Sequence, residues 1–314
     1  MSADRNYTLD LPMPIECDTN FNNSREIVKY LTQSIYISIS IWLHFLILRI
    51  ILVKKRKEFE KNTFFRIYLV DILASLTMNL IDVLYTRPLI FIPPICPILS
   101  PFFENPSILA TIFYTLPNYM KAMKSLTQMF MSINRMWCVI WPLDYKIRWQ
   151  KMIKPVIFLI VAGPIFITWN VMISRTCTFA MYGGFSFSYV KRVTGTWAKL
   201  SVLHLGLLLV SLVTTVICTA ITVVGLVAMP NRLKNAEKTL CVATVCISMG
   251  FIATALTQSL FAFCSSCALS ITLLMIQYFC YDFLNLGSPL VIIFMSSELK
   301  SQIFPTKVQE LKSY

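Results

Sequence analysis

The chain has 314 residues, of which 56% are hydrophobic and only 14% are charged. Soluble domains carry about 25% charged residues, so this composition excludes an ordinary soluble protein and indicates an integral membrane protein. A net charge of +13 would indicate a nucleic-acid partner in a soluble chain. Here the positive residues stand in short clusters between apolar segments, as membrane topology requires, and we expect a lipid bilayer and no nucleic acid as the partner.

Seven segments are apolar enough to span a bilayer as helices, which takes about 20 residues each. They are residues 28–53, 64–85, 108–141, 153–174, 197–229, 239–263 and 270–295. We therefore predict an all-α membrane protein whose seven-transmembrane helix bundle covers 28–295, with an N-terminal segment 1–27 and a tail 296–314. No repeat relates 28–141 to 153–263, which disfavours a transporter built from two similar halves.

The segments that connect these helices divide into two sets by charge. One set holds 15 Lys and Arg residues, in 54–63, 142–154, 230–238 and 296–314. The other set holds six, in 1–27, 86–107, 175–196 and 264–269. Because positive loops stay in the cytoplasm, we predict that the N-terminus lies outside and the C-terminus inside. Glycosylation sequons at Asn6 and Asn22 fall in the predicted outer segment and agree with this orientation.

Two of the predicted outer loops have a distinct character. Residues 86–107 contain six prolines, which exclude a helix interior and predict a stiff, extended cover. In 175–196, Phe185, Phe187 and Tyr189 alternate with serines, and this period of two predicts a half-buried strand preceded by a turn at Gly183-Gly184. We interpret the three aromatic residues as a lid over the outer mouth of the bundle, the alternative being a plain surface loop.

Five cysteines are assigned to the outer side, where oxidising conditions allow disulfides. They are Cys17, Cys96, Cys177, Cys264 and Cys267. Five cysteines cannot all pair with one another, and connectivity is not readable from sequence. We expect a bond between Cys96 and Cys177, which would tie the top of the third helix to the lid.

Charged side chains inside membrane segments are costly and are functional candidates by default. The polar candidates are Asp71, Asp82, Lys121, Lys124, Asp282 and Asn285. At about 1.5 Å per residue, Lys121 and Asp282 both lie roughly 21 Å from the inner ends of their helices. We therefore predict an ion pair between Asp282 and the lysines. This pair would serve as a ligand contact or as a latch. The alternative is that it only fixes the packing of helices three and seven. Asp71 is expected to face Arg66 or a hydrated pocket near the cytoplasmic side.

The sequence contains no pattern typical of a catalytic or metal site. The two histidines, His44 and His204, lie in apolar segments with no carboxylate nearby. A Gly-rich phosphate loop and a His-Glu-x-x-His motif are both absent. Cys264 and Cys267 form a lone C-x-x-C without the second pair that zinc requires. We expect no enzyme activity, no metal and no cofactor.

Four stretches carry a family resemblance. They are SLTQMFMSINRMWCVIWPLDYKIRW (125–149), FIPPICPILSPFF (91–103), ITWNVMISR (167–175) with YGGFSFSYVKRV (182–193), and PNRLKNAEKTLC (230–241). With these stretches in this order over nearly its whole length, the chain resembles the nematode serpentine receptor class gamma family. The N-R…W-P…Y…W series that starts at Asn134 is the most specific part.

This resemblance implies a G-protein-coupled chemoreceptor for a small environmental or pheromone-like molecule, in the plasma membrane and in sensory-neuron cilia. The broader superfamily ends helix three with an Asp-Arg-Tyr-like triplet, and Asn134, Arg135 and Met136 stand at these positions. The arginine is present and its acidic neighbour is not. The resemblance implies that Asn134 and Arg135 contact a heterotrimeric G protein together with Arg232 and Lys234, although the basic segment around Arg232 would also serve topology alone.

Two other functions compete with a receptor. A seven-helix ligand-gated channel or transporter would share the hydropathy pattern, but receptor-like channels of the insect type place the N-terminus inside, opposite to the charge pattern here. A scaffold or trafficking protein without a ligand would not need charges inside the bundle.

Overall fold

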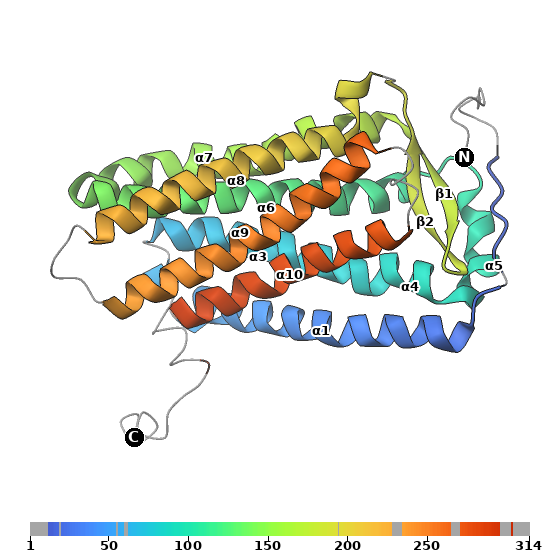
Figure 1. The fold of residues 1–314 in the computed structure, drawn as a ribbon, viewed down its shortest axis with the longest axis horizontal. Coiled ribbons are helices and arrows are strands. Elements are labelled where there is room, and N and C mark those ends of the chain that lie inside the picture. The colour runs from blue at the N-terminus through green and yellow to red at the C-terminus, as the bar shows by residue number, and fades with distance from the viewer. Residues whose placement is uncertain are drawn as a thin grey trace.

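Long helices account for most of the computed structural model, which describes residues 12–18, 20–54, 56–59, 62–193, 195–227, 234–264, 271–295 and 303. Within these residues seven helices of 19 to 33 residues lie lengthwise against one another (Figure 1). They are α1 (Asn23–Arg49), α3 (Thr63–Ile81), α6 (Ile108–Ile140), α7 (Pro142–Ile173), α8 (Leu200–Val227), α9 (Lys234–Phe263) and α10 (Ile271–Met295). A π-helical turn η1 (Ile50–Lys54) and the short helix α2 (Arg56–Phe59) follow α1.

Several of these helices have the length and composition of membrane spans. Among the described residues four stretches meet these two criteria, namely Asn23–Lys54, Thr63–Phe91, Ile147–Ile173 and Leu200–Gly225. Their outward faces expose large apolar side chains such as Trp42, Phe158 and Val213. Exposing so much apolar surface to water costs free energy, whereas exposing it to lipid does not. The bundle is therefore built to have lipid around it.

The proline-rich segment 86–107 is not extended, and the prediction for it was wrong. The π-helical turn η2 (Asp82–Thr86) and α4 (Arg87–Phe91) continue the line of α3, and η3 (Pro93–Ile95), α5 (Cys96–Leu99) and η4 (Ser100–Phe103) follow. A proline stands in the first turn of α4, η3, α5 and η4. The backbone N–H groups of a first turn have no partner within the helix, so each of these four short helices tolerates a proline there.

A two-stranded hairpin crosses one end of the bundle (Figure 1). The strands β1 (Arg175–Met181) and β2 (Gly184–Val190) pair antiparallel, which confirms the strand predicted from the alternating aromatic residues. Tyr182 and Gly183 form the turn with φ values of 53° and 78°, one residue earlier than predicted. We call this end of the bundle the hairpin end, and the opposite end, where α6 meets α7, the Arg135 end.

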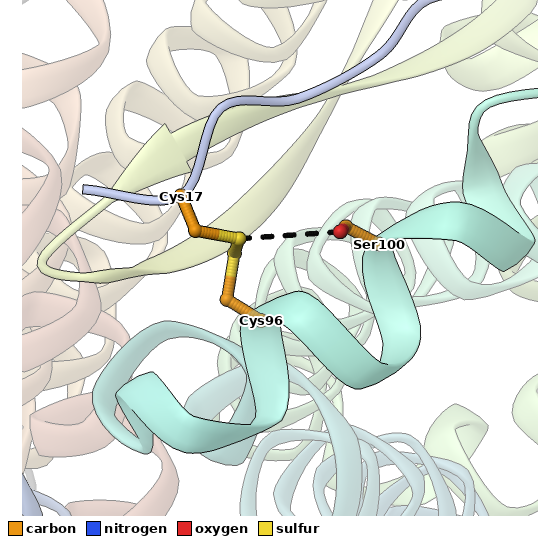
Figure 2. Close-up of a disulfide and its surroundings, with 3 residues drawn as sticks. All are labelled: Cys17, Cys96 and Ser100. Atoms are coloured by element: carbon orange, nitrogen blue, oxygen red, sulfur yellow. Dashed lines mark hydrogen bonds between the residues drawn. A yellow bond between two sulfur atoms is a disulfide. The ribbon is translucent and has the colours of Figure 1, made fainter. Parts of the chain in front are cut away.

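The N-terminal segment is fastened to the hairpin end by a disulfide between Cys17 and Cys96 (Figure 2). The backbone N–H of Met13 also donates to the carbonyl of Glu104 at 2.9 Å. The predicted Cys96–Cys177 bond is wrong, since Cys177 has a free thiol in β1. The short helix α5 turns Cys96 toward the N-terminal segment, where its Cα lies 6.1 Å from that of Cys17, a normal disulfide separation.

Candidate functional site

Arg87 is the centre of a buried charge cluster at the hairpin half of the bundle. Its side chain is 1% exposed, and its Nη2 donates to both carboxylate oxygens of Asp282 at 2.6 Å. The Nη1 of Arg87 donates to Gln33 Oε1 at 2.7 Å and to Tyr36 OH at 3.1 Å. The hydroxyl of Tyr36 in turn donates to Asp282 Oδ2 at 2.6 Å. Asp82 lies 4.0 Å from Arg87 Nη2. This group, which we call the Arg87 cluster, joins α1, η2, α4 and α10.

The predicted ion pair between Asp282 and the lysines of helix three is wrong. Asp282 is paired with Arg87, and within the described residues neither Lys121 nor Lys124 lies within 4.0 Å of it. The prediction ended the second helix at residue 85 and left Arg87 in a loop. Because η2 and α4 continue that helix, the Arg87 side chain enters the bundle and reaches Asp282 first.

A second buried cluster surrounds Asp71, which is fully buried. Lys124 Nζ lies 3.4 Å from Asp71 Oδ2 and donates to Ser75 Oγ at 2.7 Å. The hydroxyl of Thr127 donates to Asp71 Oδ1 at 2.8 Å, and that of Ser288 donates to Oδ2 at 2.9 Å. The carboxylate therefore joins α3, α6 and α10 instead of facing a hydrated pocket. We call this group the Asp71 cluster.

Asn285, another predicted polar candidate, extends these contacts from α10 to α1. Its Nδ2 donates to Asn79 Oδ1 at 3.1 Å, and Asn79 Nδ2 donates to Ser40 Oγ at 3.2 Å. The hydroxyl of Ser40 donates back to the carbonyl of Asn285 at 3.3 Å. A buried polar group without a partner costs free energy, so this chain of bonds fixes the relative position of three helices.

The Arg135 end contains a cavity of about 370 Å³. Its lining consists of Asn62, Phe64, Phe65, Asn134, Arg135, Cys138, Tyr145 and Ile292. These residues come from the start of α3, the end of α6, the start of α7 and the end of α10. The guanidinium of Arg135 lies 4.7 Å from the centroid of the Phe64 ring, a cation–π contact. We call this space the Arg135 cavity.

Asn134 takes part in a neutral hydrogen-bond network at the wall of this cavity. Its Nδ2 donates to Thr63 Oγ1 at 3.1 Å, and Tyr145 OH donates to its Oδ1 at 3.0 Å. The hydroxyls of Thr63 and Tyr145 are 2.8 Å apart. An acidic residue at position 134 would place a carboxylate beside Arg135. The asparagine instead ties α6 to α3 and α7 without any charge.

The three predicted lid residues all point from β2 toward the bundle. Phe185 is fully buried, with its ring centroid 5.9 Å from that of Phe103. Phe187 stacks on Tyr85 at 5.8 Å. Tyr189 accepts a hydrogen bond from the backbone N–H of Leu200 at 3.0 Å. The hairpin is thus held to η2, η4 and α8 by its aromatic face.

Several predicted residues fall where the structure gives little or no description. Asn6 and Arg232 lie outside the described residues, and Lys234 begins α9 without a described side chain. Asn22 is exposed, and its Oδ1 accepts from the backbone N–H of Arg25 at 3.2 Å as the N-cap of α1. Glycosylation at Asn22 stays a prediction.

Sequence reasoning missed Arg87, Tyr36 and Phe64 as functional candidates. Arg87 had a readable signal, because a lone arginine between two apolar runs is unusual in a proline-rich outer loop. Tyr36 and Phe64 had none, since aromatic residues are common in membrane helices. Their roles follow only from what the fold brings next to them, which is Asp282 in one case and Arg135 in the other.

Comparison with known proteins agrees with the resemblance read from the sequence. The profile described as Srg family chemoreceptor matches residues 30–303. The chain is 38% identical to serpentine receptor class gamma-13 of Caenorhabditis elegans over 304 residues, which cover 96% of this chain and 90% of that protein. It is 40% identical to serpentine receptor class gamma-5 of the same organism over 292 residues, which cover 93% and 90%.

These relatives are named as receptors, which fits the expectation of a protein that is not an enzyme. Their family has a seven-helix membrane architecture, in agreement with the helices and apolar outer faces described above. The match covers almost the whole chain at well over 30% identity. This chain is therefore an integral membrane protein that belongs to the Srg family of chemoreceptors.

Proposed function

We propose that this protein is a chemosensory receptor that binds a small molecule at the hairpin half of its bundle and signals to a heterotrimeric G protein through the Arg135 cavity. In this proposal the hairpin end faces outward and the Arg135 end faces the cytoplasm. The charge of the connecting segments supports this orientation. Plasma-membrane and ciliary placement follow from the same proposal.

The observation that carries the proposal is the Arg135 cavity. At about 370 Å³ it has room for several side chains, and it is lined by four different helices. An arginine fork can donate to backbone carbonyls or to a terminal carboxylate, which are the groups that the end of a partner helix offers. The Phe64 ring lies over the guanidinium, so a partner would have to replace that contact.

Two helices connect the hairpin half with the Arg135 cavity. Along α6 lie Lys121, Lys124 and Arg135, and α10 carries Asp282 and Ile292. A ligand that favours one packing of α10 against α6 shifts the population of the receptor toward that packing. The same shift changes the shape of the cavity, because Ile292 and Arg135 both line it.

A cell assay tests this function. The chain is expressed with a promiscuous G protein, and small-molecule pools are screened for a calcium response. We expect a responding pool whose signal is abolished by Arg135→Ala at unchanged surface level. The matched control is Arg148→Ala. This variant removes an exposed arginine at the same end of the bundle, which forms an ion pair with Asp144 one turn away. A current that persists when G-protein signalling is blocked would instead indicate a channel.

A further inference from the structure

A proline interrupts the hydrogen bonds of α10 two turns before the helix ends. Pro289 has no backbone N–H, so the carbonyl four residues earlier, that of Asn285, cannot receive its usual helical hydrogen bond. Asn285 is only 1% exposed, so water does not replace that bond freely. A buried carbonyl without a donor costs free energy. This break in α10 therefore needs a donor from another helix.

Ser40 of α1 supplies the donor. Its hydroxyl donates to the Asn285 carbonyl at 3.3 Å. A hydroxyl has one hydrogen, and His44 Nδ1, 3.5 Å from Ser40 Oγ, does not take it. That nitrogen lies 2.7 Å from the Ser40 carbonyl, which can only accept, so the nitrogen is itself a donor. Asn79 Nδ2 donates to Ser40 Oγ at 3.2 Å, which leaves the hydroxyl hydrogen for Asn285.

The two parts of α10 on either side of this break are held differently. Before the break, Asp282 is bound in the Arg87 cluster, and at the break Ser288 donates to Asp71 Oδ2 at 2.9 Å. The last two turns, residues 289–295, read PLVIIFM and carry only apolar side chains. Apolar packing has no preferred direction, whereas hydrogen bonds do. The last two turns can therefore shift against their neighbours while the polar part stays in place.

The break also has room to bend. A Cβ added to Gly287 would meet no neighbouring atom of the described residues within 4 Å, so this side of the turn is not packed. Proline and glycine are the usual causes of a helix kink. Ile292, in the part beyond the break, lines the same cavity as Arg135. A change of angle at the break therefore changes the shape of the Arg135 cavity.

We propose that Ser40 is a positioning residue for signalling, whose hydroxyl closes the break at Pro289 and so holds the last two turns of α10 in the arrangement that shapes the Arg135 cavity. The inference deepens the proposed function and rests on it for its role in signalling. The bond is a single neutral one, so a change of packing between α1 and α10 can open it.

A thiol in the cavity wall reports on this arrangement without any G protein. Cys138 lines the Arg135 cavity, whereas Cys177 lies in β1 and Cys218 is buried in α8. The purified full-length receptor in lipid nanodiscs is treated with N-ethylmaleimide, and mass spectrometry gives the labelling rate of each cysteine. We expect Ser40→Ala to label Cys138 about threefold to tenfold faster, the shift that loss of one hydrogen bond produces. Cys177 and Cys218 should keep their wild-type rates.

A double variant separates the break from general packing. Pro289→Ala restores the N–H that bonds the Asn285 carbonyl, so the Ser40 hydroxyl is no longer needed there. In this background Ser40→Ala should change the labelling of Cys138 by less than about twofold, a non-additive result that identifies a direct coupling. The control is Thr222→Val. It removes a buried hydroxyl that bonds the Cys218 carbonyl within α8, and it should leave the labelling of Cys138 unchanged.

Three results would overturn the inference. They are a wild-type rate for Cys138 in Ser40→Ala, an equal acceleration in the Pro289→Ala background, and a matching acceleration of Cys177 and Cys218. Nucleotide exchange by an added G protein is measured on the same samples without ligand, and Ser40→Ala should raise it. The predicted labelling without exchange by any variant would refute the proposed coupling and leave the role of Ser40 in shaping the cavity standing. Exchange that depends on Arg135, with unchanged labelling in Ser40→Ala, would do the reverse.

Discussion

The two ends of the bundle are held by different kinds of interaction. At the hairpin end, the Cys17–Cys96 disulfide, the hairpin and the Arg87–Asp282 ion pair fasten the helices together. At the Arg135 end, the hydrogen bonds that Asn134 makes are neutral, and Arg135 and Phe64 form a cation–π contact at the wall of a cavity of about 370 Å³. A disulfide and a buried ion pair thus constrain the hairpin end, whereas the cation–π contact at the cavity wall is weak enough for a partner to replace.

This difference fits a receptor that recognises at one end and responds at the other. Recognition needs side chains that stay in place, and a buried charge pair with a disulfide provides them. A response needs contacts that a modest binding free energy can change, since allosteric coupling is typically only about 1–3 kcal/mol. A cation–π contact worth about 0.5–2 kcal/mol is within that range.

The largest effect is expected at the Arg87 cluster. Asp282→Ala leaves the buried Arg87 guanidinium without its partner, and breaking a buried pair in this way costs about 3–5 kcal/mol. We expect a collapse of surface expression and a large fall in Tm. The double variant Arg87→Met, Asp282→Leu should recover much of the loss, because it removes both charges. The exposed pair Asp144–Arg148 is the contrast, since Asp144→Ala should cost less than about 1 kcal/mol.

The disulfide should give the next largest effect. Cys17→Ser removes a bond that closes a long loop, whose ends have a sequence separation of 79. Such bonds stabilise by about 2–4 kcal/mol, so a lower Tm and greater sensitivity to proteases at the hairpin end are expected. Cys177→Ser should leave both unchanged. A loss of Tm in Cys177→Ser with none in Cys17→Ser, measured by thermal melting, would mean that Cys177 and not Cys17 is the partner of Cys96.

A smaller effect is expected from Phe64. Phe64→Leu keeps an apolar side chain at the cavity but removes the ring that lies over Arg135. Because this contact holds the arginine in the unbound arrangement, we expect basal G-protein signalling to rise a few-fold at equal surface level. Phe158→Leu, on the exposed face of α7, is the control. Basal signalling that falls or stays constant in Phe64→Leu would contradict a restraining role for the ring.

The smallest effect concerns the thiol of Cys177. Burial in the hairpin raises the pKa of this thiol above its usual value. The reactive thiolate is therefore scarcer at pH 7.5 than for an exposed cysteine, and it increases as the pH rises. We expect slow alkylation by iodoacetamide that accelerates with pH up to at least pH 9. Rapid labelling at neutral pH, measured by mass spectrometry, would show that the hairpin does not cover this residue.

The class of fold was readable from the sequence because it depends on hydropathy, which is a local property. The strand at Phe185 to Tyr189 was readable for the same reason, since its alternation is visible in five residues. The Asp282 partner was not readable. The identity of the residue that pairs with Asp282 depended on whether the second helix ends before Arg87. A proline inside a helix would stop it, but a proline in the first turn of α4 allows the helical path to continue.

The disulfide and the Arg135 cavity escaped prediction because they depend on which segments meet. Cys17 and Cys177 were both possible partners for Cys96, and only the direction of α5 selects Cys17. Arg135 was readable as a candidate, but its contact with Phe64 joins α6 to the first turn of α3. No pattern within either helix contains that information.

Nucleotide exchange on a reconstituted G protein tests the central claim most directly. Wild-type receptor and Arg135→Ala are compared in nanodiscs at equal receptor content, with a ligand taken from the cell screen and with Arg148→Ala as the control. The account predicts ligand-dependent exchange by wild type and by Arg148→Ala, and none by Arg135→Ala, while all three bind the ligand with similar affinity. Exchange by Arg135→Ala at the wild-type rate would contradict it.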